Sequence, residues 1–269
     1  MHLANQKTSQ SKYQLSLRVL RNELLCGTYH LIDVVIPSGI DLNIIKPGQF
    51  VEVAAPNERY LLRRPISICD ILREERLMRL LIAPVGRGTE QICKVSENEN
   101  LDIVFPLGNG FSLPDKHSKP LLIGGGVGIA PLLYQAKEIF RSGIKPTVLL
   151  GAKEGRFLKL GEVFEPYCNL VICTDDGSLG HKGFVTEAPI WDEFDYTHTY
   201  VCGPMPMMKN LAKLLAEKKV VAEFSLENMM ACGLGACLCC VEDTKDGHKC
   251  VCTEGPVFNL KDLKWLENK

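Results

Sequence analysis

Half of the cysteines in this chain lie close together near its C-terminus. Of twelve cysteines in 269 residues, six fall between positions 232 and 252. Cys232, Cys237 and Cys240 follow the spacing C-x4-C-x2-C, and Cys252 stands twelve residues further on. A two-iron, two-sulfur cluster needs four thiolates, and the plant-type arrangement takes three from one tight loop and the fourth from a distant segment. The spacing therefore predicts a 2Fe-2S cluster held by these four cysteines.

The residues between the predicted ligands suit a loop that wraps around a cluster. Gly233 and Gly235 let the backbone bend sharply and direct N–H groups toward the cluster sulfurs, which tunes the reduction potential. Two further thiols, Cys239 and Cys250, are adjacent to predicted ligands. Because spacing alone also permits C-x4-C-x-C, it does not by itself choose between Cys239 and Cys240.

A structural zinc site is the alternative for these cysteines, since zinc also takes four sulfur ligands. Zinc ribbons pair two short C-x2-C knuckles, however, and this loop has one.

Disulfides are disfavoured because the polar start of the chain lacks the apolar core of a signal peptide, so we expect a cytoplasmic protein with reduced thiols. Five isolated cysteines are expected to be buried thiols: Cys26, Cys69, Cys93, Cys168 and Cys173.

Composition restricts the class of protein and the kind of partner. The chain is 46% hydrophobic and 23% charged, which is ordinary for a globular protein. Its net charge is −1 and it has no basic stripe, so we expect no nucleic-acid partner. The longest apolar run, at residues 121–134, is interrupted by glycines and too short to span a bilayer, so we expect no membrane association.

The residue pattern changes character near position 119. Before it, short β-branched or alternating stretches, such as 31–36 and 49–53, are punctuated by proline and glycine, which predicts a small antiparallel barrel. After it, buried strands alternate with helices, which predicts a parallel sheet. The expected strands are 120–123, 146–150, 170–173 and 200–202, and the expected helices are 131–141 and 205–218.

We therefore predict an α+β multi-domain protein with three parts. Residues 1–115 form an antiparallel β-barrel domain, residues 116–223 form an α/β parallel-sheet domain, and residues 224–269 form a small iron–sulfur domain. The last part is too short for a large core and is expected to fold around its cluster.

Glycines follow the first strand of the predicted sheet and precede a helix. Gly124, Gly125, Gly126 and Gly128 would let a pyrophosphate approach the backbone at a helix N-terminus. The alternative is a tight strand-to-helix turn with no ligand.

A second small-residue opening, Cys202-Gly203-Pro204, follows a later strand at the same edge of the sheet. The alternative there is a helix start with proline in its first turn.

Two polar motifs lie in the predicted barrel. In Arg64-Pro65-Ile66-Ser67 a guanidinium stands three residues from a hydroxyl. The Arg64 guanidinium could bind a pyrophosphate through two hydrogen bonds, and the Ser67 hydroxyl could hydrogen-bond a ring heteroatom. Gly88 and Thr89 offer a second phosphate loop of backbone amides with a hydroxyl. A surface arginine and a plain turn are the corresponding alternatives.

The order of these motifs along the chain resembles the ferredoxin–NADP reductase superfamily, and most closely the electron-transfer subunits of class B dihydroorotate dehydrogenase. The resemblance covers nearly the whole chain. Its most specific parts are Arg64-Pro-Ile-Ser67, residues 124–131, Thr174-Asp-Asp-Gly-Ser178, Cys202-Gly-Pro-Met205, residues 230–240 and residues 252–258.

The resemblance implies three cofactor sites. FAD would be held by Arg64, Pro65, Ile66, Ser67, Leu81, Ile82, Ala83, Gly88 and Thr89. NAD(H) would bind as a diffusible substrate at Gly124, Gly125, Gly126, Gly128, Cys202 and Gly203. The four predicted cysteines would hold the cluster, because the family's C-x4-C-x2-C selects Cys240. The chain departs from its relatives at Ala83-Pro84, where an aromatic or basic residue often stands.

The resemblance also implies the function. Electrons would pass between NAD(H) and an FMN-containing catalytic subunit that interconverts dihydroorotate and orotate in pyrimidine biosynthesis, in a heterotetramer. This chain itself shows no catalytic residue, since its histidines, including His30, His181 and His248, are scattered. We expect NAD(H) rather than NADP(H), because the segment after the second strand offers Lys153 beside Glu154 instead of an arginine cluster, although Arg156 is close.

Two other functions stay open. The same electron module could serve a hydrogenase or a ferredoxin:NADP oxidoreductase, but some of those relatives carry Asp at the first ligand position, and Cys232 argues against them. The chain could instead be a zinc-stabilised nucleotide sensor, which would be colourless where flavin and cluster are coloured.

Overall fold

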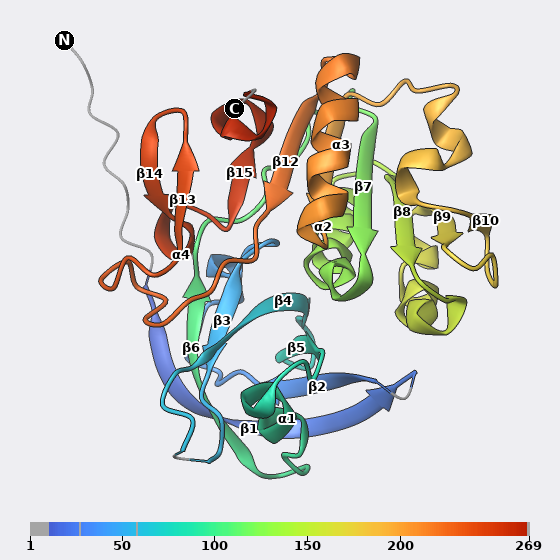
Figure 1. Ribbon diagram of the computed structural model, residues 1–269. Helices are drawn as coiled ribbons and strands as arrows, with labels where there is room; N and C mark the ends of the chain where they lie inside the picture. Colours follow the sequence, from blue (N-terminus) through green and yellow to red (C-terminus); the bar gives the residue numbers. More distant parts are fainter. Residues whose placement is uncertain (1–10, 27, 58, 268–269) are drawn as a thin grey trace.

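Six antiparallel strands in the N-terminal part of the chain close into a barrel, as predicted (Figure 1). The computed structural model describes residues 11–267 apart from residues 27 and 58. The barrel strands follow the order β1-β2-β5-β4-β3-β6. Their bounds are β1 Tyr13–Leu25, β2 Tyr29–Val35, β3 Phe50–Val53, β4 Arg64–Leu72, β5 Leu77–Ile82 and β6 Asn100–Leu107, and helix α1 (Arg87–Cys93) follows β5.

The barrel interior follows from the alternation of side chains along its strands. Val51 and Val53 of β3 are fully buried in its core, together with Ile68 of β4 and Leu80 of β5. Because strand side chains point alternately to opposite faces, the intervening residues of β3, Phe50 and Glu52, face outward. This outward face of β3 contacts other parts of the chain and not solvent, since both residues are buried.

A seven-stranded sheet forms the second part of the molecule, in the order β10-β9-β8-β7-β11-β12-β15. All neighbouring pairs in it are parallel except β12 with β15. The strand bounds are β7 Pro120–Gly125, β8 Thr147–Ala152, β9 Asn169–Thr174, β10 His181–Lys182, β11 His198–Cys202, β12 Val221–Ser225 and β15 Val257–Asn259. Helices α2 (Ala130–Arg141) and α3 (Met205–Lys218) pack against it, so the predicted α/β arrangement is confirmed.

Local sequence explains the course of these elements. Every residue of β7 is buried, as expected for an internal strand of a parallel sheet covered on both faces. Pro131 stands in the first turn of α2, where a missing N–H costs nothing. Gly143 has φ +91° just after α2 and ends it with a left-handed residue.

Short 3-10 helices occupy several connections. They are Leu42–Ile44, Gly126–Ile129, Gly155–Val163, Glu165–Tyr167, Val185–Glu187, Pro189–Trp191, Leu260–Asp262 and Lys264–Leu266.

The C-terminal tail contains secondary structure of its own in addition to the cysteine loop. It contains the hairpin β13 (Val241–Thr244) and β14 (Gly247–Cys250) and the single turn α4 (Val251–Glu254). Its last strand, β15, then pairs antiparallel with β12 and extends the main sheet. The predicted division at residues 223/224 lies inside β12, and the joining of tail to sheet was not predicted.

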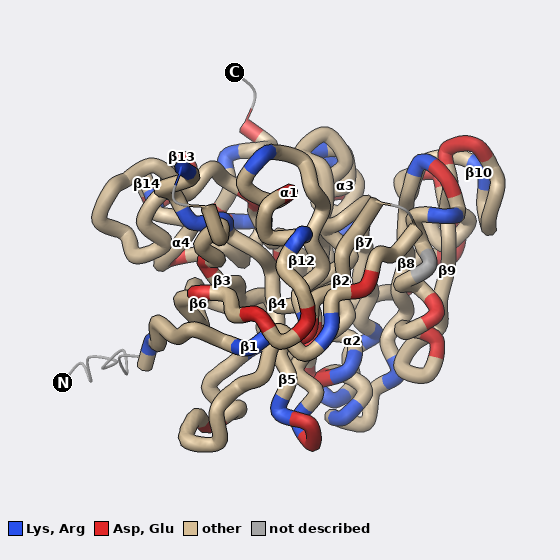
Figure 2. The backbone as a smooth tube through the Cα atoms, turned by 90° about the horizontal axis from the view of Figure 1, so that it is seen from below, with Lys and Arg blue, Asp and Glu red and all other residues tan. Residues whose placement is uncertain are grey.

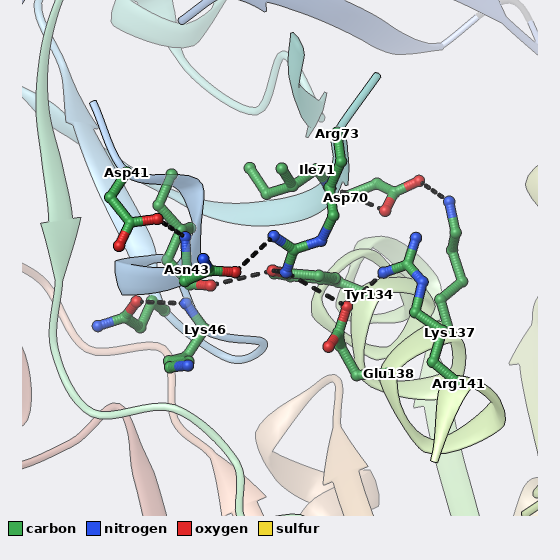
Figure 3. A network of polar contacts seen from close by, with 12 residues as sticks. Asp41, Asn43, Lys46, Asp70, Ile71, Arg73, Tyr134, Lys137, Glu138 and Arg141 are labelled. Carbon is green, nitrogen blue, oxygen red and sulfur yellow. Dashed lines mark hydrogen bonds and ion pairs between the residues drawn. The ribbon is translucent and has the colours of Figure 1, made fainter. Parts of the chain in front are cut away.

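A polar network joins α2 to the barrel (Figure 3). The Lys137 ammonium lies 2.5 Å from Oδ2 of Asp70 on β4, and the two side chains are only 9% and 1% exposed. The Tyr134 hydroxyl donates to the backbone oxygen of Ile45 at 2.9 Å and accepts from Arg73 at 3.3 Å. These contacts fix the parallel sheet against the barrel and so set how their facing surfaces meet.

The distribution of charges and thiols can be followed along the described chain. Segments of Lys and Arg and segments of Asp and Glu are both scattered along the backbone seen in Figure 2, with no basic stripe in that view. Among the residues the structure describes, no helix is long and apolar enough to cross a membrane. All twelve cysteines are free of disulfides, and of the five isolated thiols only Cys26 is partly exposed.

Candidate functional site

Two clefts open between the barrel and the sheet, and the first lies at the carboxyl edge of the parallel strands. It has a volume of about 690 Å³. Gly125 and Gly126 line it from the predicted glycine loop, and Tyr29 and Ala83 line it from the barrel. The carboxyl edge of a parallel sheet is where such folds bind nucleotides.

The two glycine motifs pack against each other beneath this cleft. A Cβ atom at Gly128 would lie 2.6 Å from both the Cα and N atoms of Gly203, so no side chain fits. One at Gly125 would lie 2.5 Å from the sulfur of Met207 in α3. Gly126 has φ +56° and open space beyond its Cα, so its bare backbone faces the cleft.

The remaining predicted residues of this motif support the cleft from behind. Gly124, Gly128, Cys202 and Gly203 do not line it. Cys202 is 1% exposed, and burial raises the pKa of its thiol far above the usual range, so it is an inert packing residue. Pro204 directly precedes α3, so the segment is both a helix start and part of the cleft floor.

The second cleft has a volume of about 330 Å³ and lies on the barrel. Barrel residues that were predicted to hold a flavin line it: Pro65, Ile66, Ser67, Leu81, Ala83 and Thr89. Its opposite wall is residues 225–230, which continue directly into the cysteine loop. Ala83, Val85 and Val127 line both clefts, so the two share an apolar wall.

Of the two arginines that precede Pro65, Arg64 hydrogen-bonds only to nearby backbone oxygens, those of Leu62 and Arg63. A Cβ atom at Gly88 would overlap its guanidinium, so the structure brings the two predicted phosphate motifs together. Arg63 instead binds the barrel, donating to the Asp102 backbone oxygen at 2.9 Å and pairing with its carboxylate at 2.5 Å. Of the two guanidinium groups, only that of Arg64 therefore lies beside the backbone of Gly88.

Thr89 and Ile82 were both predicted to hold FAD, but their side chains make structural contacts within the barrel part of the chain. The Thr89 hydroxyl accepts from Gly86 N at 3.1 Å and donates to Gly86 O at 2.9 Å, so it caps α1. Ile82 is packed in the barrel core, and its side chain lines neither cleft.

Backbone amides in the cysteine loop point at thiol sulfurs. Leu234 N lies 3.4 Å from the sulfur of Cys232, and Gly235 N lies 3.2 Å from that of Cys252. The amide of Cys252 lies 3.4 Å from the sulfur of Cys240. Amides that donate to sulfur favour the thiolate form, which is the form that binds metal.

The thiols of the predicted ligands influence one another: Cys237 acts on Cys232, and Cys240 and Cys232 both act on Cys252. The Leu234 amide, followed by Cys237, lowers the pKa of Cys232 to about 6, whereas burial and then Cys240 raise that of Cys252 to about 12. Within the part of the chain that the structure describes, no three His, Cys, Asp or Glu side chains converge closely enough to hold one metal ion. The four neighbouring thiols and the backbone amides that donate to their sulfurs fit a two-iron cluster, in which each iron takes two thiolates.

Of the two additional thiols, Cys239 is exposed and Cys250 is half-buried at the end of β14. Cys240, by contrast, is 2% exposed and faces Cys252. The structure thus places Cys240 inward and its neighbour outward.

Sequence reasoning missed several residues of these clefts. Phe157, Asp175 and Phe184 line the first cleft from segments after β8, β9 and β10. Residues 225–230 were assigned to the tail, although they form a wall of the second cleft. Asp175 belongs to the motif Thr174–Ser178 that carries part of the family resemblance, but the sequence analysis gave it no role. Its position at the carboxyl end of a predicted strand could have indicated that it lines the cleft.

Comparison with known proteins agrees with this geometry. Residues 227–264 match the family model described as the iron–sulfur cluster binding domain of dihydroorotate dehydrogenase B. Electron transfer subunits of dihydroorotate dehydrogenase B (NAD(+)) from Desulforamulus reducens and Clostridium perfringens are 41% and 39% identical to this chain. The alignments cover 81% and 82% of this chain and 87% and 88% of those proteins.

Solved structures share the fold. The structure of an NADH-dependent reduced ferredoxin-NADP oxidoreductase superposes with a TM-score of 0.84 at 30% identity, covering 93% of this chain and 90% of that one. A cytochrome P450 reductase from Amycolatopsis shares the fold at 22% identity, with a TM-score of 0.68 and coverage of 79% and 68%. The resemblance read from the motifs is thus confirmed, and this chain belongs to the family of dihydroorotate dehydrogenase B (NAD(+)) electron transfer subunits, which are oxidoreductase subunits.

Proposed function

We propose that this chain carries electrons between NAD(H) and an FMN-containing subunit that interconverts dihydroorotate and orotate. NAD(H) would enter the first cleft, FAD the second, and a 2Fe-2S cluster the cysteine loop. The observation that carries this proposal is continuity: the clefts share a wall, and residues 225–230 lead from the second cleft to Cys232. Family membership supports the same task.

The barrel side chains suit FAD. Arg64 would neutralise pyrophosphate charge beside the backbone of Gly88, because no side chain at 88 intervenes. Ser67 would meet a polar edge of the flavin ring, since it lines the cleft at the register position opposite Phe50. The apolar wall at Ala83 and Val127 would exclude water between the two bound molecules.

When bound, FAD would supply the exchange between the two-electron chemistry of NADH and the one-electron capacity of a cluster. The chain's own contribution is to bind and orient. Gly126 exposes backbone to the nucleotide, and the loop amides of Leu234 and Gly235 stabilise thiolates. The proposal also includes a three-part division of the chain at residues 115 and 223, a cytoplasmic location and assembly into a heterotetramer.

Purification of the full chain tests the proposal. Its visible spectrum should show flavin and cluster absorption, and NADH should support reduction of an artificial dye. No turnover of dihydroorotate or orotate should occur until the FMN subunit is added, which should create NAD-linked activity. A colourless, zinc-containing chain would overturn the electron-transfer proposal, and turnover of orotate by the chain alone would overturn the subunit assignment.

The similarity to the NADH-dependent reduced ferredoxin-NADP oxidoreductase supports a second candidate, the same module serving a ferredoxin-linked partner. Copurification from native cells separates the two. Recovery of an FMN-containing dihydroorotate-oxidising subunit supports the first proposal, and recovery of a hydrogenase or ferredoxin reductase subunit replaces it.

A further inference from the structure

Glu52 is a buried carboxyl group that the sites described above do not use. It lies within β3 and is 1% exposed. Among the described residues, neither of its carboxylate oxygens has a hydrogen-bond partner. Burying such a group without a partner costs free energy, and here burial raises the pKa of the carboxyl to about 7. Packing alone gives no reason for a carboxylate at this position.

The strand places Glu52 between the second cleft and the cysteine loop. Val51 and Val53 occupy the barrel core, whereas Phe50 and Glu52 share the outward face of β3. Phe50 lines the second cleft, and side chains two residues apart on one face stand about 7 Å apart. Glu52 therefore lies one step further along the strand, away from the cleft and toward the loop.

The side chain of Glu52 packs directly on the loop backbone. A Cβ atom at Gly233 would lie 2.7 Å from Cγ and 3.1 Å from Oε1 of Glu52. Gly233 has φ +66°, so this position is suited to glycine for its backbone as well as for the space. Gly233 immediately follows Cys232, the first predicted ligand, so the carboxyl group lies beside the cluster site.

The charges around Glu52 leave it poorly compensated. Arg63 and Arg64 attract it, and the charge of Cys232 repels it. The guanidinium of Arg63 already pairs with Asp102 at 2.5 Å, and that of Arg64 lies over Gly88. No arginine therefore hydrogen-bonds the Glu52 carboxylate.

We propose that Glu52 lowers the reduction potential of the cluster held by the cysteine loop, an inference that rests on the proposed function. Reduction adds one electron to the cluster. A carboxylate packed against the loop in a medium of low dielectric repels that added charge and so disfavours the reduced form. An electron that reaches the cluster is then passed on more readily to an acceptor.

The test is an EPR-monitored redox titration of the full chain at about pH 8.5, where the Glu52 carboxyl is ionised because this pH lies above its raised pKa of about 7. Glu52→Gln keeps the shape and removes the charge. The midpoint potential of the cluster in this variant should rise by about 59 mV. For a one-electron couple, this shift corresponds to a tenfold change in the ratio of reduced to oxidised cluster. Iron content and EPR line shape should match the wild type.

Two further variants distinguish charge from packing. Glu52→Asp keeps a charge and should leave the potential near that of the wild type. Asp246→Asn removes a carboxylate from the β13–β14 hairpin, where the side chain is 73% exposed and screened by water, and should also leave it unchanged.

An unshifted potential in Glu52→Gln with a full cluster would overturn the proposal. Loss of the cluster in both Glu52 variants would overturn it too, by giving this residue a purely structural role. Absence of any cluster signal in the wild type would instead overturn the proposed function.

Discussion

At the scale of single residues, the ligand set of the cysteine loop is the sharpest prediction. Serine at Cys232, Cys237, Cys240 or Cys252 should abolish the visible absorption of the cluster, because each removes a thiolate. Serine at the exposed Cys239 should leave it intact, and Cys250→Ser is a second control. Absorption spectra with iron analysis decide the matter. A normal cluster in Cys240→Ser together with its loss in Cys239→Ser would refute the assignment.

The two adjacent arginines provide a matched pair at the same scale. Arg64→Ala should release FAD from a folded chain, since its guanidinium lies over Gly88 and is not tied to the barrel by an ion pair. Arg63→Ala should lower thermal stability instead, because it removes the contacts with Asp102. Flavin content per chain and the melting temperature check both expectations. Equal flavin retention in the two variants would contradict them.

At the scale of elements, α2 depends on the buried pair between Lys137 and Asp70. Lys137→Met should destabilise the fold by about 3–5 kcal/mol, because it leaves Asp70 buried and without its cation. Removing both charges with Asp70→Leu and Lys137→Met should recover most of that loss. Denaturant unfolding of the three chains measures this. A cost below about 1 kcal/mol in the single variant would show that α2 is held by apolar packing alone.

Hydrogen bonds from Ser112 to the Glu223 carboxylate hold the connection between β6 and β7 against β12, and their contribution to stability depends on pH. Burial alone would raise the pKa of Glu223, but hydrogen bonds from His198 and Ser112 outweigh it and lower the pKa. The native state therefore holds this proton less tightly than the unfolded chain does. The stabilisation is complete above the ordinary glutamate pKa of about 4.3 and is lost as pH falls through the lowered value.

Glu223→Gln should accordingly cost about 1–3 kcal/mol near neutral pH, and the difference from wild type should shrink in acid. Unfolding midpoints measured across this pH range check the trend. A difference that stayed constant with pH would exclude the carboxylate as its source.

At the scale of the whole molecule, the first cleft should select NAD(H) over NADP(H). A 2′-phosphate favours an arginine cluster, whereas this cleft is lined by Lys153 and the acidic Asp175. Arg156 is paired with Glu154 at 2.9 Å and lies over the ring of Phe157. NADH should exceed NADPH by about tenfold or more in kcat/KM for dye reduction. Comparable kcat/KM values for NADH and NADPH would disprove the preference. The variant Asp175→Asn should reduce the ratio of the two kcat/KM values, because it removes the acidic group from the cleft.

The features that are local along the chain could be predicted from the residues alone. Strand alternation predicted the barrel, strand–helix alternation predicted the parallel sheet, and the motifs at Gly124–Gly128 and Cys232–Cys240 stand at the expected elements. Each of these depends on spacing between near neighbours, since side-chain direction and backbone freedom follow from a few consecutive residues.

The relations between distant segments became visible only in the folded chain. It placed the Arg64 guanidinium against Gly88 and that of Arg63 against Asp102, turned β15 back onto β12, and brought residues 225–230 to the second cleft. It also set Glu52 against Gly233, 181 positions later in the chain. No local pattern encodes such contacts, because each joins segments that are distant in the chain and that meet only when the whole molecule is closely packed.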